Sequence, residues 1–599
     1  MENNDVLKGG EFLVRNANAR ETFIPEEFDE EQIMIAQTCE DFLQTEIYPN
    51  LDRIDKQEPG LMKSLVQKAG ELGLLGVSIP EEYEGFGQSF LTSMKANEAI
   101  GSAYSYSVAF MAHTGIGTLP ILYYGSEDQK QKYIPKLVTG ELTAAYCLTE
   151  PGAGSDANAG KTRAVLSDDG KHYILNGQKM WITNGGFADV FTVFAKIEND
   201  RVLSAFIVDK ELEGITINPE EHKMGIKGSS TTQIFFNDVK VPVENLLGKR
   251  GEGFRIALNI LHIGRIKLGG TVIGASKKAI DHSVNYANER KQFGQQISNF
   301  GAIKQKLSEQ VIRTFATESA LYRATKDIDD TIQKYLADGM TYGEANVRGP
   351  AQFAIECALL KVYGSESLDY IVDEAVQIYG GMGFSSEAPV DRAYRDSRIN
   401  RIFEGTNEIN RLLMVDTALK RAMKGEIDLF AKAKEVVQAL QKSKDQNIGL
   451  KSYYEEKYIH IRNFKDAVLM ILGDASEKFK RKFVSEQEIW MNIADMMIDL
   501  YAAESTLLRV EKIDMMNEEK EEDPDKVSIY KDILDILIYD IAARIHKAGS
   551  DAINSFTLGQ ERLLLLDSLQ RFTKVAPINI RDKRRIIADK LIEDNRYKF

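Results

Sequence analysis

Glu404 is the residue whose chemical type and sequence context best suit catalysis. It follows Ile402 and Phe403 and precedes Gly405 in the segment RIFEGTNEINR, residues 401–411. A carboxylate after two apolar residues, at a turn opened by glycine, can lie in a dry pocket and still be reached by a ligand. Burial raises a carboxyl pKa toward neutrality, which suits a general base. These residues alone also allow a surface or capping carboxylate.

Thr406 begins a second feature of the same segment. It is a suitable N-cap for a helix whose apolar face contains Ile409, Leu412 and Leu413. The first turn of such a helix can also bind an anionic phosphate.

Two segments in the middle of the chain combine glycine, hydroxyl and aromatic residues. AYCLTEPGAGSDA (145–157) contains a loop that exposes backbone N–H groups, and KMWITNGG (179–186) contains Trp181. Trp181 could stack on an aromatic cofactor while Thr183 donates a hydrogen bond. The alternatives are an ordinary turn and a core tryptophan.

Two further segments lie toward the C-terminal side. NERKQFG (288–294) places Arg290, whose planar fork suits pyrophosphate, near a predicted helix end. DEAVQIYGGMGF (373–384) contains the pair Gly380–Gly381, where a chain can pass close to a ligand. A surface arginine and a helix C-cap are the alternatives.

Hydrophobic periodicity divides the chain around these segments. Residues 29–136 show helical spacing, 142–247 show period-two runs with Gly-, Asn- and Asp-rich loops, and 253–424 return to long helical periods with stops near Gly294, Gly343 and 380–383. We predict a small antiparallel barrel or sandwich between two helical regions. The predicted domains are an arm (1–28), a helical domain (29–141), a β-domain (142–252), a helical bundle (253–424) and a helical extension (425–599).

Composition limits the possible functions of the chain. The 599 residues carry a net charge of −15, which leaves no global basic surface for nucleic acid. The chain contains no uninterrupted apolar run of about 20 residues, so we expect no spanning helix. Cys39, Cys147 and Cys357 lie far apart and indicate neither disulfides nor a metal site. Only 5 of the 45 glycines fall in residues 425–599, so we expect the extension to hold no site.

Taken together, the five segments resemble the acyl-CoA dehydrogenase family. AYCLTEPGAGSD, MWITNGG, ERKQFG, VQIYGGMGF and FEGTNEINR occur in that family's order over roughly residues 30–420, and the extension resembles that of the very-long-chain branch. The resemblance implies an α+β, mostly α fold: an N-terminal helical domain, a middle β-domain, a four-helix bundle and an extra all-α domain, with FAD as the cofactor.

The resemblance also implies roles for individual residues. Glu404 is the expected catalytic base. Ser155, His262 and Arg265 are the expected acyl-CoA contacts, although medium-chain relatives carry Asp at the position of His262. The expected FAD-binding residues are Tyr146, Leu148, Thr149, Gly154 and Ser155; Trp181 and Thr183 at the flavin edge; Arg290, Phe293, Gln377 and Gly381, which reach FAD across a subunit interface; and Thr406 and Glu408 at the adenosine and pyrophosphate end.

The implied reaction is α,β-dehydrogenation of an acyl-CoA. Glu404 would remove the α-proton while the β-hydrogen leaves as hydride to the flavin, giving trans-2-enoyl-CoA. Two branches of the family place their base just before Arg265, but Gly264 occupies that position here. In HTGIGTLP (113–120), Gly115 and Gly117 suggest an open pocket floor and long acyl chains.

The resemblance further implies electron-transfer flavoprotein as the redox partner and a homodimer in which the extension covers the surface that relatives use to form tetramers. An oxidase that uses O₂ and a non-catalytic scaffold on the same fold are the alternatives. We expect a cytoplasmic protein. Its basic segment RDKRRIIADK forms an exposed helix face and gives at most a peripheral contact with a membrane or partner.

Overall fold

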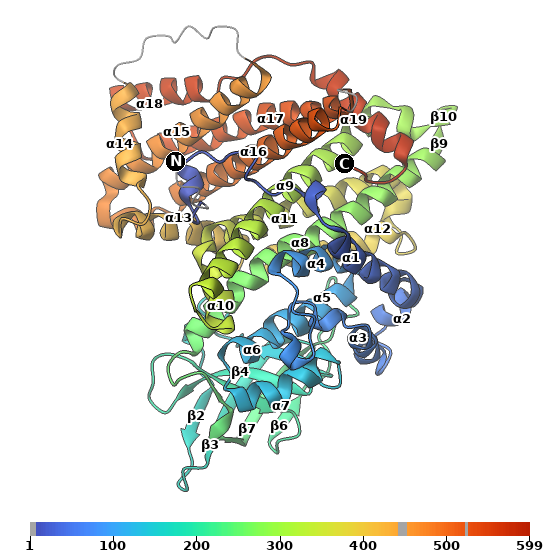
Figure 1. Ribbon diagram of the computed structural model, residues 1–599, viewed down its shortest axis with the longest axis vertical. Coiled ribbons are helices and arrows are strands. Elements are labelled where there is room, and N and C mark those ends of the chain that lie inside the picture. Colours follow the sequence, from blue (N-terminus) through green and yellow to red (C-terminus); the bar gives the residue numbers. More distant parts are fainter. Residues whose placement is uncertain (1–6, 441–451, 522–524) are drawn as a thin grey trace.

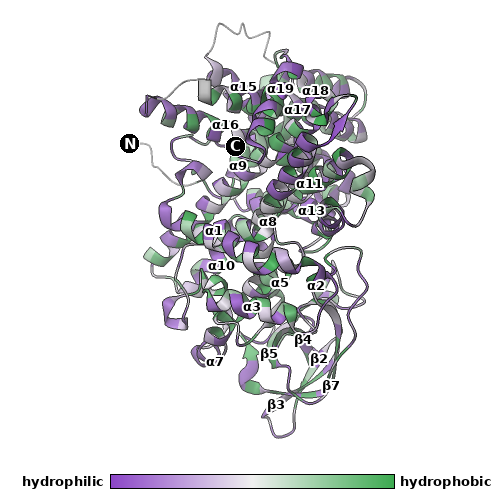
Figure 2. Cartoon of the chain, turned by 90° about the vertical axis from the view of Figure 1, so that its right-hand side faces the viewer, coloured by the Kyte–Doolittle hydropathy of each residue, from purple (hydrophilic) through white to green (hydrophobic). Residues whose placement is uncertain are grey.

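The computed structural model describes residues 7–440, 452–521 and 525–599. The molecule is elongated, with the large β-sheet at one end, the long central helices in the middle and the C-terminal extension at the other end (Figures 1 and 2). The chain is 67% helical.

The N-terminal helical domain packs short helices against the long helix α8. Its first helix begins with a capping box in which Asp29 accepts a hydrogen bond from the backbone N–H of Gln32 at 2.8 Å. The helices are α1 (Glu30–Phe42), α2 (Leu51–Asp55), α3 (Leu61–Glu71), α4 (Phe90–Gly101), α5 (Ser105–Met111), α6 (Leu119–Tyr124) and α7 (Glu127–Val138), with the π-helical turn η7 (Ala112–Gly117) between α5 and α6.

The β-domain is a mixed sheet with the path β6-β7-β3-β2-β4-β5-β8, and β1 pairs with β4. Its strands are β1 (Ala144–Cys147), β2 (Arg163–Leu166), β3 (His172–Thr183), β4 (Val190–Ile197), β5 (Ser204–Asp209), β6 (Ile215–Ile217), β7 (Thr231–Pro242) and β8 (Leu246–Leu247). The prediction of an antiparallel sheet is wrong in part, because β4 pairs in parallel with both β1 and β2. Both are short strands that reach β4 through long crossovers, which period-two spacing does not reveal.

The bundle consists of long helices and one short hairpin. They are α8 (Gly253–Glu289), β9 (Lys291–Gln292), β10 (Gln295–Gln296), α9 (Gly301–Ala337), α10 (Tyr342–Gln352), α11 (Ala354–Tyr379), α12 (Pro389–Ser397) and α13 (Asn407–Met423). The predicted stop near Gly343 is confirmed as a break between α9, which ends at Ala337, and α10, which begins at Tyr342, but Gly343 itself is not the breaking residue. Gly343 lies inside α10, since Thr341 caps that helix by accepting the N–H of Glu344 at 3.3 Å.

Helix α8 is long and apolar enough to span a membrane by length and composition. The most apolar 18-residue window has a mean hydropathy of 1.3, but 67% of that window is buried inside the protein. The helix lies in the middle of the molecule (Figure 2) and packs against α4, α9 and α11. Its place is therefore that of a core helix in the bundle.

The extension is a layer of helices on the outer face of the bundle. It contains α14 (Leu429–Leu440), α15 (Tyr453–Phe479), α16 (Gln487–Glu519), α17 (Asp525–Phe556), α18 (Gly559–Phe572) and α19 (Ile580–Asp594). One hydrophobic core runs without interruption from the bundle into this layer. The extension is therefore packed as part of the body and not as a detached domain.

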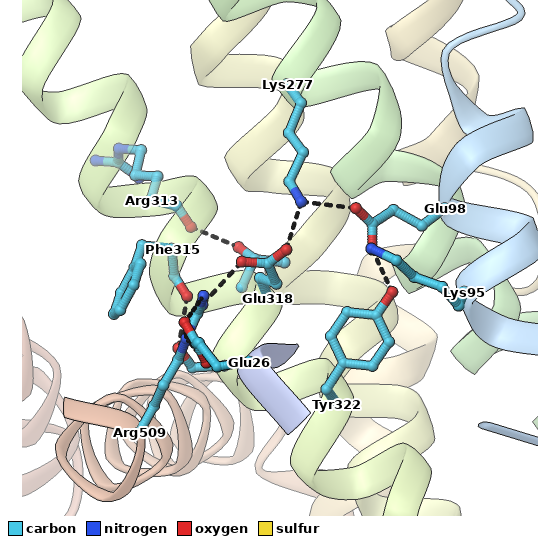
Figure 3. Close-up of polar contacts among 11 residues, drawn as sticks. Glu26, Lys95, Glu98, Lys277, Arg313, Phe315, Glu318, Tyr322 and Arg509 are labelled. Atoms are coloured by element: carbon cyan, nitrogen blue, oxygen red, sulfur yellow. Dashed lines mark hydrogen bonds and ion pairs between the residues drawn. The ribbon is translucent and has the colours of Figure 1, made fainter. Parts of the chain in front are cut away.

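Buried ion pairs also connect the extension to the body. Arg509 on α16 binds Glu318 on α9 at 2.8 Å and Glu26 of the N-terminal arm at 2.7 Å (Figure 3). Glu318 also pairs with Lys277 on α8, whose ammonium lies 2.6 Å from Glu98 on α4. We name this set of side chains (Glu26, Glu98, Lys277, Glu318 and Arg509) the buried charge cluster.

The basic segment near the C-terminus lies on α19. Lys583 pairs with Asp535 at 3.0 Å, and Arg584 pairs with Glu309 and Asp540 at 3.0 Å each. These cations bind carboxylates of the same chain, so they help hold α19 against α9 and α17.

Candidate active site

A cavity of about 980 Å³ lies where the N-terminal domain, the β-domain and the bundle meet. Its size is that of a site for a large organic ligand. One face of α8 forms a wall along much of the cavity, and the loop between η12 (Arg398–Arg401) and α13 forms another part.

The cavity collects most of the residues that the sequence singled out. The predicted residues that line it are Tyr146, Leu148, Thr149, Gly154, Ser155, Trp181, Thr183, Arg265, Glu404 and Thr406. They come from four segments that are far apart in the sequence.

Glu404 lies in a backbone turn that several polar groups hold. It adopts φ +57° and is followed by Gly405 at φ +84°. Arg265 donates to the Glu404 carbonyl at 3.2 Å, and Lys361 donates to the Gly405 carbonyl at 2.8 Å. Asn410 donates to the same Gly405 carbonyl at 2.8 Å. These hydrogen bonds to backbone carbonyls fix the turn without using the Glu404 side chain, which remains free to face the cavity.

The Glu404 carboxylate has the environment of a general base. Burial raises its pKa, and the nearby cations of Arg265 and Lys361 oppose that rise. Its Oε2 atom is buried and has no hydrogen-bond partner among the residues that the structure describes. An unpartnered buried acceptor in a cavity is expected where a ligand supplies the missing contact.

Gly264 leaves room for this carboxylate. A Cβ atom at position 264 would lie 2.6 Å from Oε2 of Glu404 and 3.0 Å from its carboxyl carbon. A side chain at 264 would therefore compete with Glu404 for the same space.

Two residues that the sequence reasoning did not single out join the two β-domain segments. Lys179 donates to Glu150 at 2.7 Å and to the Leu148 carbonyl at 3.2 Å, and this ion pair is almost fully buried. The backbone N–H of Met180 also donates to the Thr149 carbonyl at 3.0 Å. Glu150 and Lys179 both stand inside the two segments quoted from the sequence. A carboxylate in one segment and a lysine in the other were therefore the signal that could have identified this ion pair.

Trp181 belongs to the cavity and not to the core of the β-domain. It has φ +56°, it is 60% exposed, and it lies at an irregularity of strand β3 between Lys179 and Ile182. The irregular backbone turns the ring out of the sheet, which makes its face available to a ligand.

The remaining predicted residues do not line the cavity of this chain. His262 instead faces Arg265, with its Nδ1 atom 3.2 Å from the guanidinium. Burial and the Arg265 charge lower the pKa of His262 to about 3, so it is neutral and accepts this hydrogen bond. Glu408 is exposed in the first turn of α13. The structure therefore makes His262 a residue that orients Arg265.

Arg290, Phe293, Gln377 and Gly381 lie together at another end of the bundle. The rings of Tyr286 on α8 and Tyr379 on α11 stack there, with centroids 4.0 Å apart. Phe293 is 93% exposed at the tip of the β9–β10 hairpin. These four residues are exposed, and none of them lines the cavity of their own chain.

Polar atoms on the cavity wall fit a flat, oxygen- and nitrogen-rich ligand. The hydroxyls of Tyr146 and Thr231, like Oε2 of Glu404, are buried without a partner in the described part of the chain. An exposed indole and unpartnered hydroxyls around one cavity suit an isoalloxazine ring, which has an aromatic face and a hydrogen-bonding rim.

Comparisons with known proteins agree with this site. Family models match residues 29–141 (acyl-CoA dehydrogenase, N-terminal domain), 145–239 (middle domain), 251–419 and 463–571 (both described as C-terminal domain). A probable acyl-CoA dehydrogenase of Bacillus subtilis is 44% identical over 99% of both chains. The rat very long-chain specific acyl-CoA dehydrogenase is 37% identical over 77% of this chain and 71% of the rat protein.

Solved structures give the same result. The acyl-CoA dehydrogenase from Bacillus anthracis, complexed with FAD, superposes with a TM-score of 0.95 at 43% identity, covering 99% of this chain and all of that one. A chain from a structure described as the electron transferring flavoprotein of Acidaminococcus fermentans has a TM-score of 0.59 at 34% identity, over 66% of this chain and 98% of that one. The predicted fold class and family are confirmed: the chain belongs to the acyl-CoA dehydrogenase family of FAD-dependent enzymes.

Proposed function

We propose that this enzyme dehydrogenates long-chain acyl-CoA thioesters to trans-2-enoyl-CoA, with Glu404 as the base, as the first step of fatty-acid β-oxidation. The observation that supports this most strongly is the unpartnered Glu404 carboxylate in the same cavity as the Trp181 and Tyr146 segments. Removal of an α-proton and a β-hydride requires a base and a hydride acceptor. Glu404 has the raised pKa of a base, and the exposed Trp181 and the unpartnered Tyr146 hydroxyl beside it suit a flavin.

The residues of the chain divide the work of this reaction. Oε2 of Glu404 accepts the α-proton, while Arg265, Lys361 and Asn410 hold the backbone of its turn. The electron pair of the broken α C–H bond forms the new double bond. The β C–H pair leaves with the hydride, for which bound FAD would supply the two-electron acceptor. The proton ends on Glu404 and leaves with solvent in a later step.

The thioester oxygen also needs donors, because an unactivated α-proton is too weak an acid for a carboxylate. The backbone N–H of Glu404 makes no hydrogen bond within the described residues and is therefore available to that oxygen. Once bound ligands displace water from the cavity, a hydrogen bond there is stronger than the same bond in water.

The apolar part of the cavity supports a long acyl chain. Val108 and Met111 of α5 line it, and so do Gly115 of η7 and Leu268 of α8. A Cβ atom at Gly115 would meet nothing within 4 Å, so this wall is open. Gly117 does not contribute, since a Cβ atom there would lie 2.9 Å from the Ala112 carbonyl oxygen.

The test of this function is anaerobic reduction of the bound flavin by a panel of saturated acyl-CoAs from C4 to C20. We expect bleaching of the flavin absorption band with a maximum at long chains. A maximum at C4–C8 would refute the long-chain proposal, and no reduction at any length would refute dehydrogenation.

We propose electron-transfer flavoprotein as the electron acceptor. This proposal extends what the family resemblance implies, and the Acidaminococcus structure, one chain of which has this fold, is described as such a flavoprotein. Rapid reoxidation by air with release of peroxide would favour an oxidase instead. A colourless purified protein would favour a scaffold, although the unpartnered Glu404 argues against that alternative.

We further propose a cytoplasmic homodimer. Arg290, Phe293, Gln377 and Gly381 gather at an exposed end of the bundle, away from the cavity of their own chain, as a site shared with a second copy requires. The extension meanwhile covers α9 and α13. A light-scattering mass near two chains supports this assembly, and a mass near four chains contradicts it.

A further inference from the structure

Lys267 is a buried cation in the cavity that the proposed reaction does not use. It lies on α8, three residues after Gly264 and therefore about 4.5 Å further along the helix axis. The residue is 5% exposed and lines the same cavity as Glu404.

The Lys267 ammonium has no hydrogen bond or ion pair within residues 7–440, 452–521 and 525–599. Burial lowers its pKa to about 8, and no charged neighbour opposes that change. Other buried lysines of this protein are different, since Lys179, Lys361 and Lys465 each bind oxygen atoms within 2.8 Å. A buried ammonium without an acceptor is costly, so the natural acceptor is a ligand.

The position of Lys267 favours the acyl chain over the cofactor as that ligand. Immediately beyond it, α8 packs closely on α4, because a Cβ atom at Gly270 would lie 2.7 Å from the sulfur of Met94 and one at Gly274 would lie 1.9 Å from the Glu98 carbonyl oxygen. Neither α4 nor α5 carries any of the predicted cofactor residues, which come from the β-domain, the two ends of the bundle and the turn that follows Glu404. Apolar residues of α5 and η7 line the same cavity, and η7 contacts α8.

We propose that Lys267 is a specificity residue whose ammonium binds an oxygen-bearing group, a carboxylate or a hydroxyl, on the acyl chain of the substrate. The proposal rests on the proposed acyl-CoA dehydrogenation. A methyl-terminated chain that passes Lys267 leaves its ammonium without an acceptor, whereas an oxygen substituent at that depth forms a charge-assisted hydrogen bond. The residue therefore selects among acyl groups by a polar substituent beyond the reacting carbons.

The test uses purified holoenzyme and two series of acyl-CoAs from C6 to C16, one with a terminal carboxylate and one with a terminal methyl group. The rate of anaerobic flavin reduction gives kcat/KM for each compound. Within each variant, the ratio of the carboxylate to the methyl compound of equal length cancels any loss of folded enzyme. The variants are Lys267→Met and Lys267→Arg. Lys326→Met is the matched control, because Lys326 lies on α9 outside the cavity lining and its ammonium pairs with Asp330.

In the wild type, we expect the carboxylate-to-methyl ratio of kcat/KM to peak at one or two chain lengths. At those lengths the ratio should be about ten- to a hundredfold lower in Lys267→Met. Lys267→Arg should keep the peak, and Lys326→Met should match the wild type. Equal ratios in the wild type and Lys267→Met at all lengths would overturn the proposal.

A second measurement separates the acyl chain from the cofactor. The flavin spectrum and reduction potential of the substrate-free holoenzyme should be the same in the wild type and Lys267→Met. A changed potential would assign Lys267 to the flavin and overturn the proposal. If no compound of either series reduces the wild-type flavin, both the proposed function and this inference fail. If the compounds reduce the flavin but the carboxylate-to-methyl ratio is equal in the wild type and Lys267→Met, only the role of Lys267 is removed.

Discussion

The cavity and the interface of the C-terminal extension both bury charged side chains, but only the interface pairs them. Arg509 binds Glu318 at 2.8 Å, and Glu504 binds Arg323 at 3.0 Å, with all four side chains at most 4% exposed. In the cavity, Oε2 of Glu404 has no partner in the described part of the chain. In these two regions the paired charges join helices of the extension and the body, whereas the unpaired carboxylate lies at the ligand cavity.

The largest expected effect concerns the unpaired carboxylate. Glu404→Gln keeps the shape of the side chain but removes the base, so the rate of flavin reduction by acyl-CoA should fall by about two to four orders of magnitude. Flavin content, measured by the visible absorption of the purified protein, should not change. Glu488→Gln, at an exposed position of α16, is the control and should react at the wild-type rate. Turnover near the wild-type level in Glu404→Gln would refute the assignment of the base.

The paired charges should affect stability instead of chemistry. Arg509→Met leaves Glu318 with Lys277 alone in the buried charge cluster, so the free energy of unfolding should fall by about 3–5 kcal/mol. Urea unfolding followed by circular dichroism measures this change. The exposed pair Lys547–Asp551 provides the control, because Lys547→Met should cost less than about 1 kcal/mol. A similar loss in both variants would show that burial of the cluster is unimportant.

A smaller effect should appear in the pH dependence of the reaction. Glu404 must be ionised to accept a proton and its pKa is raised, so kcat/KM should decline as the pH falls through a value above the ordinary carboxyl pKa of 4.5. Lys361 lowers the pKa of Glu404, so Lys361→Met should move this decline to higher pH by about one unit or less. Stopped-flow flavin reduction across pH gives the profile. Lys361→Arg keeps the cation and should resemble the wild type, and an unchanged profile in Lys361→Met would contradict the electrostatic role.

The smallest expected effect separates two glycines of η7. Gly115→Leu places a side chain in open space on the cavity wall, so the rate with C16 relative to C6 acyl-CoA should fall by about tenfold or less. Gly117→Ala instead inserts a methyl group 2.9 Å from the Ala144 Cβ atom, so it should lower the melting temperature without changing the chain-length preference. The opposite pattern would mean that Gly117, and not Gly115, forms the floor.

The sequence predicted the parts of the site that lie in contiguous segments. Glu404 with Gly405 and Thr406 forms a local turn and helix start, so its geometry is encoded within a few residues. The same holds for Trp181 and Thr183 in strand β3.

Contacts between distant segments could not be predicted in this way. Lys361 reads as one polar residue of a helix, and only the fold shows that its ammonium reaches the Gly405 carbonyl 44 residues away. Three other features depend equally on tertiary neighbours. They are the parallel pairing of β1 and β2 with β4, the close packing around Gly117, and the hydrogen bond that His262 accepts from Arg265. Local spacing contains no information on which distant group will fill a given space.

The buried charge cluster has a consequence for the order in which the protein is made. Glu318 and Arg509 are separated by 191 residues, so at a translation rate of about 5–20 residues per second the carboxylate leaves the ribosome about 10 to 40 seconds before its partner. During that interval α9 cannot complete its buried contacts, although every residue that lines the cavity has been made before the chain reaches Arg509. The nascent enzyme therefore holds a complete set of cavity-lining residues in an unfinished scaffold. Synthesis of α16 supplies the partner of Glu318, and the packing of α9 is completed only when α19 follows.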